Sequence, residues 1–185
     1  MKIILLGGCG FIGSNLAITL KKRNLKFEIY VLDNLIRKGS ELNVKRLQES
    51  EICFIRGDIR NTKDLAGLPE CDLVIDASAE ASTVAGLKDS PWYILENNLV
   101  GTINSLEMTR KMKAEFIFLS TSRVYPVKLL EQCTFMENNT RFIWTGDQQL
   151  QGVSSNGISE NFPTEGARTM YGTSKLSSEL ILQEY

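Results

Sequence analysis

Short apolar runs alternate with longer amphipathic stretches along most of the chain. The apolar runs predict strands at residues 3–6, 27–32, 52–56, 73–75 and 115–119. The stretches between them predict helices at residues 12–23, 41–50, 63–68 and 91–112. Strands that are nearly apolar throughout and alternate with helices are typical of a parallel sheet covered on both faces. We therefore predict an α/β fold with a doubly wound parallel sheet of the Rossmann type.

Two of the expected helices carry apolar side chains at helical spacing. The first follows Pro91, a residue favoured at a helix start, and the second spans residues 169–185. The expected apolar sides are Leu95, Leu99, Ile103 and Leu106 in the first helix, and Leu176, Leu180 and Ile181 in the second.

The region from about residue 126 to 168 breaks this alternation. It is polar and rich in turn residues, and a structureless loop of such length is unusual unless it is functional or becomes ordered on binding. Arg141 and Trp144 either serve a ligand there or are a solvated charge and ordinary loop packing. We treat residues 1–185 as one Rossmann domain with a long insertion at about 126–168.

Composition narrows the possible functions. The 185 residues suffice for one well-packed domain, and the net charge of -1 predicts no attraction to nucleic acid or to an anionic membrane. The sequence contains no histidine, which excludes Ser-His-Asp catalysis, HExxH zinc sites and an imidazole base. Proton transfer must then use tyrosine, lysine, a carboxylate or a hydroxyl, and we expect no metal.

The cysteines and the apolar segments indicate a cytoplasmic protein. Four cysteines are scattered without a CxxC pair, which favours buried or idle thiols over a disulfide or a metal site. The apolar run at residues 3–6 is far too short for a signal peptide, and no segment approaches the roughly 18 apolar residues of a membrane span.

A glycine-rich turn follows the first predicted strand. Gly7, Gly10 and Gly13 have GxxGxxG spacing at the start of a helix. In a dinucleotide site the first glycine permits a tight turn, the second a close approach to the pyrophosphate, and the third close helix–strand packing. The phosphates would then lie at the helix N-terminus. Alone, the same spacing also fits a glycine-rich turn without a ligand.

Acidic residues at the ends of the next two strands strengthen the dinucleotide interpretation. Asp33 follows Gly13 by about 20 residues, where a carboxylate accepts hydrogen bonds from the adenosine ribose. Asp58 ends the third strand, where a polar side chain meets the adenine edge. Asp33 would repel a 2′-phosphate, so we predict NAD rather than NADP, although Arg37 and Lys38 lie nearby.

A YxxxK motif lies in the last predicted helix. Tyr171 and Lys175 are four residues apart and therefore face the same side of that helix. An unperturbed tyrosine has a pKa of about 10, and a nearby ammonium makes tyrosine a better base by favouring its phenolate. Thr121, in a Ser/Thr cluster after the fifth strand, offers a hydroxyl for a substrate alcohol. By itself the motif also fits a solvated helix face.

Together these motifs resemble the extended short-chain dehydrogenase/reductases, the NAD-dependent epimerase/dehydratase group that acts on nucleotide-activated sugars. The similarity extends nearly end to end, through residues 7–13, Asp33, residues 58–59, 98–102, Thr121, 160–163 and 171–175. Within the group, residues 32–40 and 157–160 look most like CDP-paratose (tyvelose) 2-epimerase-type proteins.

The resemblance implies roles for particular residues. Thr121 would supply the catalytic hydroxyl, Tyr171 the base, and Lys175 a contact to the ribose that also tunes the tyrosine. Cofactor contacts are expected from Gly7, Gly10, Phe11, Ile12, Gly13, Asp33, Asn34, Asp58, Ile59, Ala77, Ser78, Ala79, Asn98 and Lys175. Asn98 matches an asparagine that in the family is structural or part of a proton relay.

Three departures from the family pattern change the expectation. Asp76 replaces the histidine that many relatives have after strand four, and it is either solvated or repacks that loop. Ser122 and Arg123 replace the Asp-Glu pair of the sugar 4,6-dehydratases, which argues against dehydratase chemistry. Relatives continue well beyond the YxxxK helix, so we expect this chain to lack the C-terminal lobe that grips the sugar nucleotide.

By resemblance, the intact enzyme is an NAD-dependent nucleotide-sugar epimerase that transiently oxidises a sugar carbinol. A net sugar dehydrogenase or reductase and a non-catalytic NAD-binding module are the alternatives. The expected partners are a nucleotide sugar and, for the full-length enzyme, a second copy in a homodimer.

Overall fold

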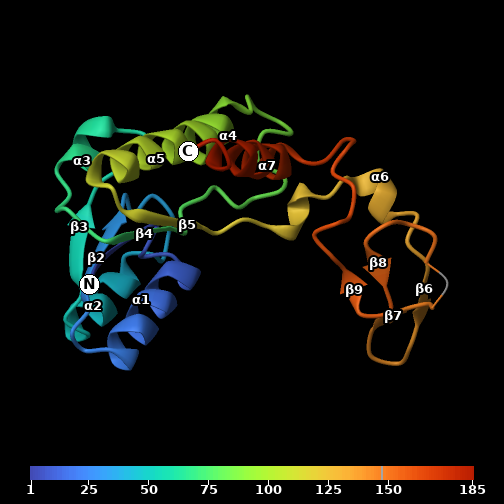
Figure 1. Cartoon of the computed structure of the whole chain (residues 1–185), viewed down its shortest axis with the longest axis horizontal. Coiled ribbons are helices and arrows are strands. Elements are labelled where there is room, and N and C mark those ends of the chain that lie inside the picture. Colours follow the sequence, from blue (N-terminus) through green and yellow to red (C-terminus); the bar gives the residue numbers. More distant parts are fainter. Residues whose placement is uncertain (147) are drawn as a thin grey trace.

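A five-stranded parallel sheet lies between two layers of helices (Figure 1). The computed structural model describes residues 1–146 and 148–185. The strands pair in the order β3-β2-β1-β4-β5, all of them parallel. Their bounds are Lys2–Leu6 for β1, Glu28–Asp33 for β2, Cys53–Arg56 for β3, Leu73–Asp76 for β4 and Glu115–Phe118 for β5. Each lies within about one residue of the predicted strand.

Helices cover both faces of this sheet, which confirms the doubly wound fold (Figure 1). One face carries α1 and α2, and the other carries α3, α5 and α7. The bounds are Phe11–Arg23 for α1, Leu42–Glu49 for α2, Thr62–Ala66 for α3, Gly101–Met112 for α5 and Met170–Leu182 for α7. Two short elements precede α5: α4 at Trp92–Leu95 and a π-helical turn, η1, at Glu96–Val100.

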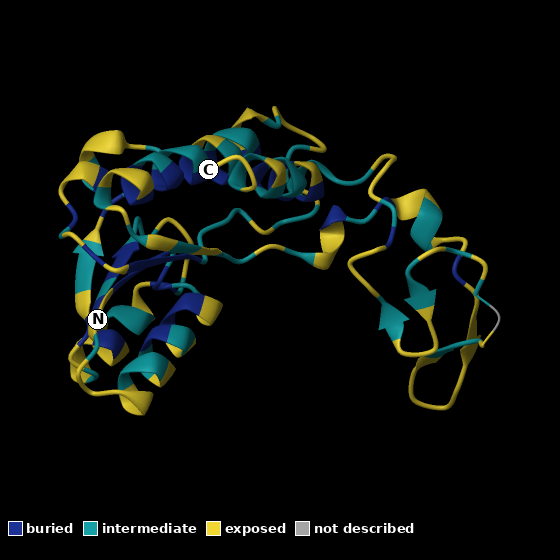
Figure 2. Cartoon of the chain, viewed as in Figure 1, coloured by how far each residue is buried: buried dark blue, intermediate teal, exposed yellow. Residues whose placement is uncertain are grey.

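The apolar core lies in two layers, one on each side of the sheet (Figure 2). Alternate residues of β1 supply both layers, with Ile3 and Leu5 on one side and Ile4 and Leu6 on the other. All four cysteines are free and three are buried, as the sequence predicted. No helix in the described part of the chain is both long and apolar enough to span a membrane.

The expected apolar sides of two helices are not their most buried sides. In α5 the most buried positions include Thr102, Ser105 and Thr109, and in α7 they include Ser174 and Ser178. By contrast, most residues of the expected apolar sides are only half-buried or exposed: Leu95, Leu99, Ile103, Leu176, Leu180 and Ile181. Both helices form as predicted and Leu106 is buried, but a small hydroxyl side chain also lies at the contact of α7 with η1, where Ser178 donates to the Asn98 carbonyl at 3.2 Å.

The region at about 126–168 contains short elements where the sequence indicated turns. It forms α6 at Val127–Leu130, a hairpin of β6 (Phe135–Glu137) with β7 (Phe142–Trp144), and a hairpin of β8 (Val153–Ser154) with β9 (Gly157–Ile158). These elements lie beyond the end of β5, away from the sheet (Figure 1). Residue 147 lies outside the described residues.

Candidate functional site

A cavity of about 280 Å³ opens at the carboxyl ends of the parallel strands. This edge is where ligands of open α/β sheets bind. Most of the residues expected to contact a cofactor line it: Gly7, Gly10, Phe11, Ile12, Gly13, Asp33, Asn34, Asp58, Ile59, Ala77, Ser78, Ala79 and Lys175. Tyr171 lines it as well, so the structure brings the predicted nucleotide motifs and the YxxxK motif into one cavity.

The glycine turn places backbone where a side chain would not fit. Gly7 has a φ of +70°, and a Cβ there would lie 2.6 Å from the Cα of Ser78. At Gly13 a Cβ would lie 2.5 Å from the Gly7 carbonyl oxygen. Helix α1 begins at Phe11 without a side-chain cap. Its first N–H groups are therefore free to bind an anion such as a pyrophosphate.

Asp33 is fixed at the end of β2 by two backbone donors. Its Oδ2 accepts a hydrogen bond from the N–H of Cys9 at 2.9 Å, and its Oδ1 accepts one from the N–H of Leu35 at 2.9 Å. Each carboxylate oxygen has two lone pairs, so both retain capacity to accept a ribose hydroxyl. The carboxylate is half-buried and lines the cavity, as a ribose-binding residue must.

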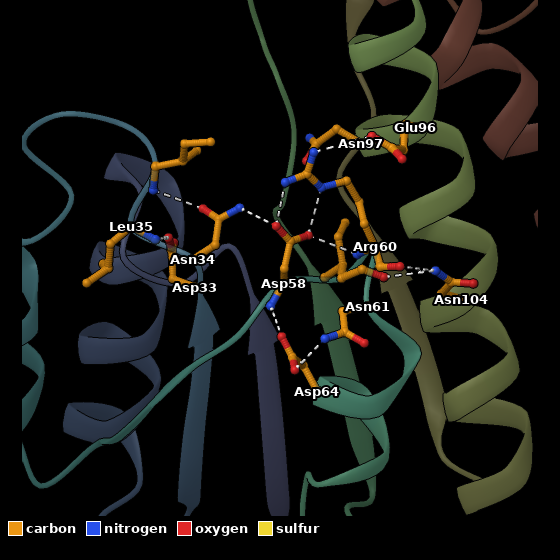
Figure 3. A network of polar contacts seen from close by, with 12 residues as sticks. Asp33, Asn34, Leu35, Asp58, Arg60, Asn61, Asp64, Glu96, Asn97 and Asn104 are labelled. Atoms are coloured by element: carbon orange, nitrogen blue, oxygen red, sulfur yellow. Dashed lines mark hydrogen bonds and ion pairs between the residues drawn. The ribbon is translucent and has the colours of Figure 1, made fainter.

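Asp58 belongs to a polar network at the same end of the cavity (Figure 3). Its carboxylate binds the Arg60 guanidinium, with a shortest distance of 2.6 Å, and accepts a hydrogen bond from the Asn34 amide at 2.9 Å. Arg60 also lies 3.4 Å from Glu96 and over the ring of Tyr93. The Arg60 hydrogen bond holds the pKa of Asp58 at about 2. The sequence placed Asp58 here but gave no signal for this network.

We expect Asp58→Asn to change how stability depends on acid. The pKa of Asp58 is lower in the folded chain than its ordinary 3.8, so its contribution is present above about pH 4 and is lost as the pH falls toward 2. Wild type should exceed the variant by about 1 kcal/mol in unfolding free energy at neutral pH, and this gap should close near pH 2.

Denaturant unfolding at several pH values measures this gap. The exposed Asp89, replaced as Asp89→Asn, is the control and should match wild type throughout. A gap between wild type and Asp58→Asn that stays constant with pH would contradict the assigned shift.

Lys175 and Tyr171 project from the first two turns of α7. Lys175 is only 2% exposed, and its Nζ lies 3.7 Å from the centroid of the Phe118 ring. Burial lowers the pKa of Lys175 to about 8, and the nearby carboxylates of Asp76 and Glu179 oppose that shift. Thr169 caps the helix by accepting a hydrogen bond from the Gly172 N–H at 3.1 Å.

Thr121 is not brought to the cavity wall. Directly after β5, Leu119 and Ser120 line the cavity and Thr121 does not. The Thr121 hydroxyl instead caps the 3-10 turn at Ser122–Val124, accepting a hydrogen bond from the Arg123 N–H at 3.2 Å. The sequence analysis did not select Ser120 as a site residue, although it is the direct neighbour of Thr121.

Asn98 lies behind the wall of the cavity, not in it. It is 1% exposed, accepts a hydrogen bond from the Glu80 N–H at 2.8 Å and donates to the Glu80 carbonyl at 3.0 Å. It also donates to the Ser174 hydroxyl at 3.1 Å. Asn98 therefore ties the loop after β4 to α7, and its neighbour Asn97 lines the cavity in its place.

Asp76 is fully buried, so the solvated alternative is wrong. Its Oδ1 accepts hydrogen bonds from the N–H and the hydroxyl of Ser78, at 2.9 and 2.5 Å. These bonds order the loop that follows β4. Arg141 and Trp144 do not line this cavity: Trp144 ends β7, and Arg141 borders a shallow hollow on the same hairpin.

Comparison with known proteins gives consistent matches. Residues 3–185 match the family model described as "NAD dependent epimerase/dehydratase family". The chain is 31% identical over 191 residues to a CDP-paratose 2-epimerase of Salmonella typhi, covering 100% of this chain and 53% of that protein. The solved UDP-Glc/GlcNAc 4-epimerase from Campylobacter jejuni superposes with a TM-score of 0.76 at 26% identity, covering 99% of this chain and 48% of that one.

A second solved structure gives a similar result. It is a mutant UDP-glucuronic acid 4-epimerase from Bacillus cereus in complex with UDP-4-deoxy-4-fluoro-glucuronic acid and NAD. The TM-score is 0.76 at 27% identity, and the match covers 100% of this chain and 52% of that one. The chain thus spans about half the length of these relatives.

Proposed function

Because this chain belongs to the NAD-dependent epimerase/dehydratase family, we propose that it is the cofactor-binding part of a nucleotide-sugar epimerase. The family resemblance inferred from the sequence is confirmed by the family model and by the relatives. The observation that carries the proposal is the single cavity that joins the glycine turn, Asp33, Tyr171 and Lys175.

The cavity fits NAD at three points. The uncapped start of α1 offers N–H groups for the pyrophosphate, and Gly7 and Gly13 leave the space that a Cβ would fill. Asp33 offers carboxylate oxygens for the adenosine ribose hydroxyls, and its charge opposes the extra phosphate of NADP. Arg37 also lines the cavity but is exposed, so it does not reverse this preference.

Tyr171 and Lys175 supply the acid–base chemistry of the proposed reaction. Bound NAD+, held by the glycine turn, Asp33 and Lys175, would supply reversible hydride transfer with a sugar carbon. Tyr171 takes the proton of the sugar hydroxyl and gives it back in the return step. Lys175, with its ammonium charged, binds the ribose of the cofactor. Thr121 would hold the sugar hydroxyl once the segment after β5 brings it to the cavity.

A non-catalytic NAD-binding module is the second candidate. The specific observation that favours it is the position of Thr121, which does not reach the cavity wall. A net dehydrogenase would use the same residues but release the reduced cofactor, and a net reductase would consume the reduced cofactor and release NAD+.

Calorimetric titration with NAD+ and NADP+, followed by a redox assay, tests the proposal. We expect NAD+ to bind at least tenfold more tightly than NADP+, because the Asp33 carboxylate repels a 2′-phosphate. When the chain is mixed with CDP-, UDP- and dTDP-sugars, reduced nicotinamide should form transiently in the wild type. It should not form in Tyr171→Phe. Binding without any redox change would favour the module, net accumulation of reduced cofactor would favour the dehydrogenase, and no binding would contradict the proposal.

We also propose that the full-length enzyme is a cytoplasmic homodimer. Free cysteines support the reducing compartment, and exposed Val100 in η1 and Leu180 in α7 supply apolar surface on adjacent elements. Light scattering of the full-length enzyme should give the mass of two chains, and the mass of one chain would contradict the dimer.

A further inference from the structure

Asp76 is a buried carboxylate to which the proposed chemistry gives no role. It ends β4, is completely shielded from solvent, and binds both donors of Ser78 through Oδ1. Its Oδ2 has one partner among the described residues, the Thr102 hydroxyl at 3.3 Å. Burial raises the pKa of Asp76 above its ordinary value, and the hydrogen bonds from Ser78 and the positive charge of Lys175 oppose this shift.

The sheet register places the Lys175 ammonium in the same layer as this carboxylate. Asp76 is the register partner of Phe118 on the neighbouring strand β5, and partners in a parallel pair project to the same face. The Lys175 ammonium lies directly over the Phe118 ring, at 3.7 Å from its centroid. Asp76 and Lys175 therefore lie on the same face of the sheet, at the adjacent strands β4 and β5, without forming a direct ion pair.

Few other charged groups act on this ammonium. Glu179, one turn later on α7, is the second acidic neighbour, and its side chain also accepts a hydrogen bond from Ser120. Asn98 of η1, which binds Ser174, and Thr102 of α5, which binds Asp76, are uncharged. None of the hydrogen bonds or ion pairs among the described residues uses the Lys175 Nζ, so its N–H groups remain available to a ligand.

We propose that Asp76 is a positioning residue that serves as the buried counter-charge of Lys175, keeping its ammonium protonated at the cavity floor. Without an opposite charge nearby, burial would favour the neutral amine form of Lys175. This form has no positive charge and one N–H donor fewer than the ammonium. The functional meaning of this pair rests on the proposed function, because there the ammonium binds the ribose of the cofactor. The charge coupling itself does not depend on cofactor binding.

Nitrogen-15 NMR of the lysine side chains, recorded on the free chain over a pH series, tests the coupling directly. We expect Asp76→Asn to lower the pKa of Lys175 by about one unit or more, because it removes the charge but keeps the shape and the acceptor for Ser78. The matched control Glu179→Gln removes the other acidic neighbour and should produce a smaller fall. The exposed Asp89→Asn should produce none.

The reciprocal measurement keeps the proposal testable if Asp76→Asn does not fold. Carbon-13 NMR of the aspartate carboxyls should show that Lys175→Met raises the pKa of Asp76, since coupling between two charges acts equally on both. The proposal would be overturned if the pKa of Lys175 were unchanged in Asp76→Asn, or if the pKa of Asp76 were unchanged in Lys175→Met. Failure of NAD+ to bind would contradict the proposed function while leaving both NMR results valid.

Discussion

We expect Gly13→Ala to lower the free energy of unfolding by about 3 kcal/mol and to abolish measurable NAD+ binding. A Cβ at this position would lie 2.5 Å from the Gly7 carbonyl oxygen and 2.6 Å from the Gly8 Cα. Both are backbone atoms of the turn, so α1 has to move away from β1. The same movement displaces the N–H groups at the start of α1 that the pyrophosphate would bind.

Denaturant unfolding and calorimetry measure the two effects of Gly13→Ala. Gly146→Ala is the matched control, because a Cβ at Gly146 meets nothing within 4 Å. Alanine is preferred over glycine inside helices by about 1 kcal/mol, so a loss of stability at Gly13 must come from packing. An unfolding free energy equal to or above that of wild type would contradict the tight contact between α1 and the turn.

We expect Asp33→Ala to weaken NAD+ binding by about tenfold to a hundredfold. The carboxylate would lose its hydrogen bonds to the ribose hydroxyls, and a hydrogen bond to a charged group contributes about 1.5–3 kcal/mol. The substitution also leaves the N–H groups of Cys9 and Leu35 without their acceptor. The Asp33 carboxylate, which joins the glycine turn to the end of β2, is then missing.

Calorimetry of three variants separates these contributions. Asp33→Asn keeps one acceptor oxygen but removes the charge, so it should lose less NAD+ affinity than Asp33→Ala and bind NADP+ relatively better. Asp89→Ala, outside the cavity, should bind NAD+ as wild type does. Equal NAD+ affinity in Asp33→Ala and wild type would show that this carboxylate does not hold the ribose.

The sheet and the nucleotide motifs were predictable because their signals are local. Each strand is a continuous apolar run, and each motif lies within a few residues of a strand end, where chain geometry alone brings it to the cavity. The polar contacts of α7 with η1 were not predictable in this way. The hydrogen bonds of Asn98 with Ser174 and with Glu80 join distant parts of the chain, and hydrophobic periodicity does not predict them.

The catalytic side of the site was predictable only in part. Tyr171 and Lys175 reach the cavity because a single helix carries both. Thr121 belongs to the segment that leaves the sheet toward the hairpins, so its position depends on how that segment folds. The burial of Asp76 was also hidden, because a strand-end carboxylate has the same sequence pattern whether it is solvated or enclosed.

The two ends of the region at 126–168 are joined where it leaves and re-enters the Rossmann domain. The Val127 N–H donates to the Ala167 carbonyl at 3.0 Å, and the Arg168 guanidinium donates to the Val124 carbonyl at 2.6 Å. The entropy of closing a loop grows only slowly with its length. This region can therefore be lengthened, shortened or exchanged during evolution while α7 keeps its place against the Rossmann domain.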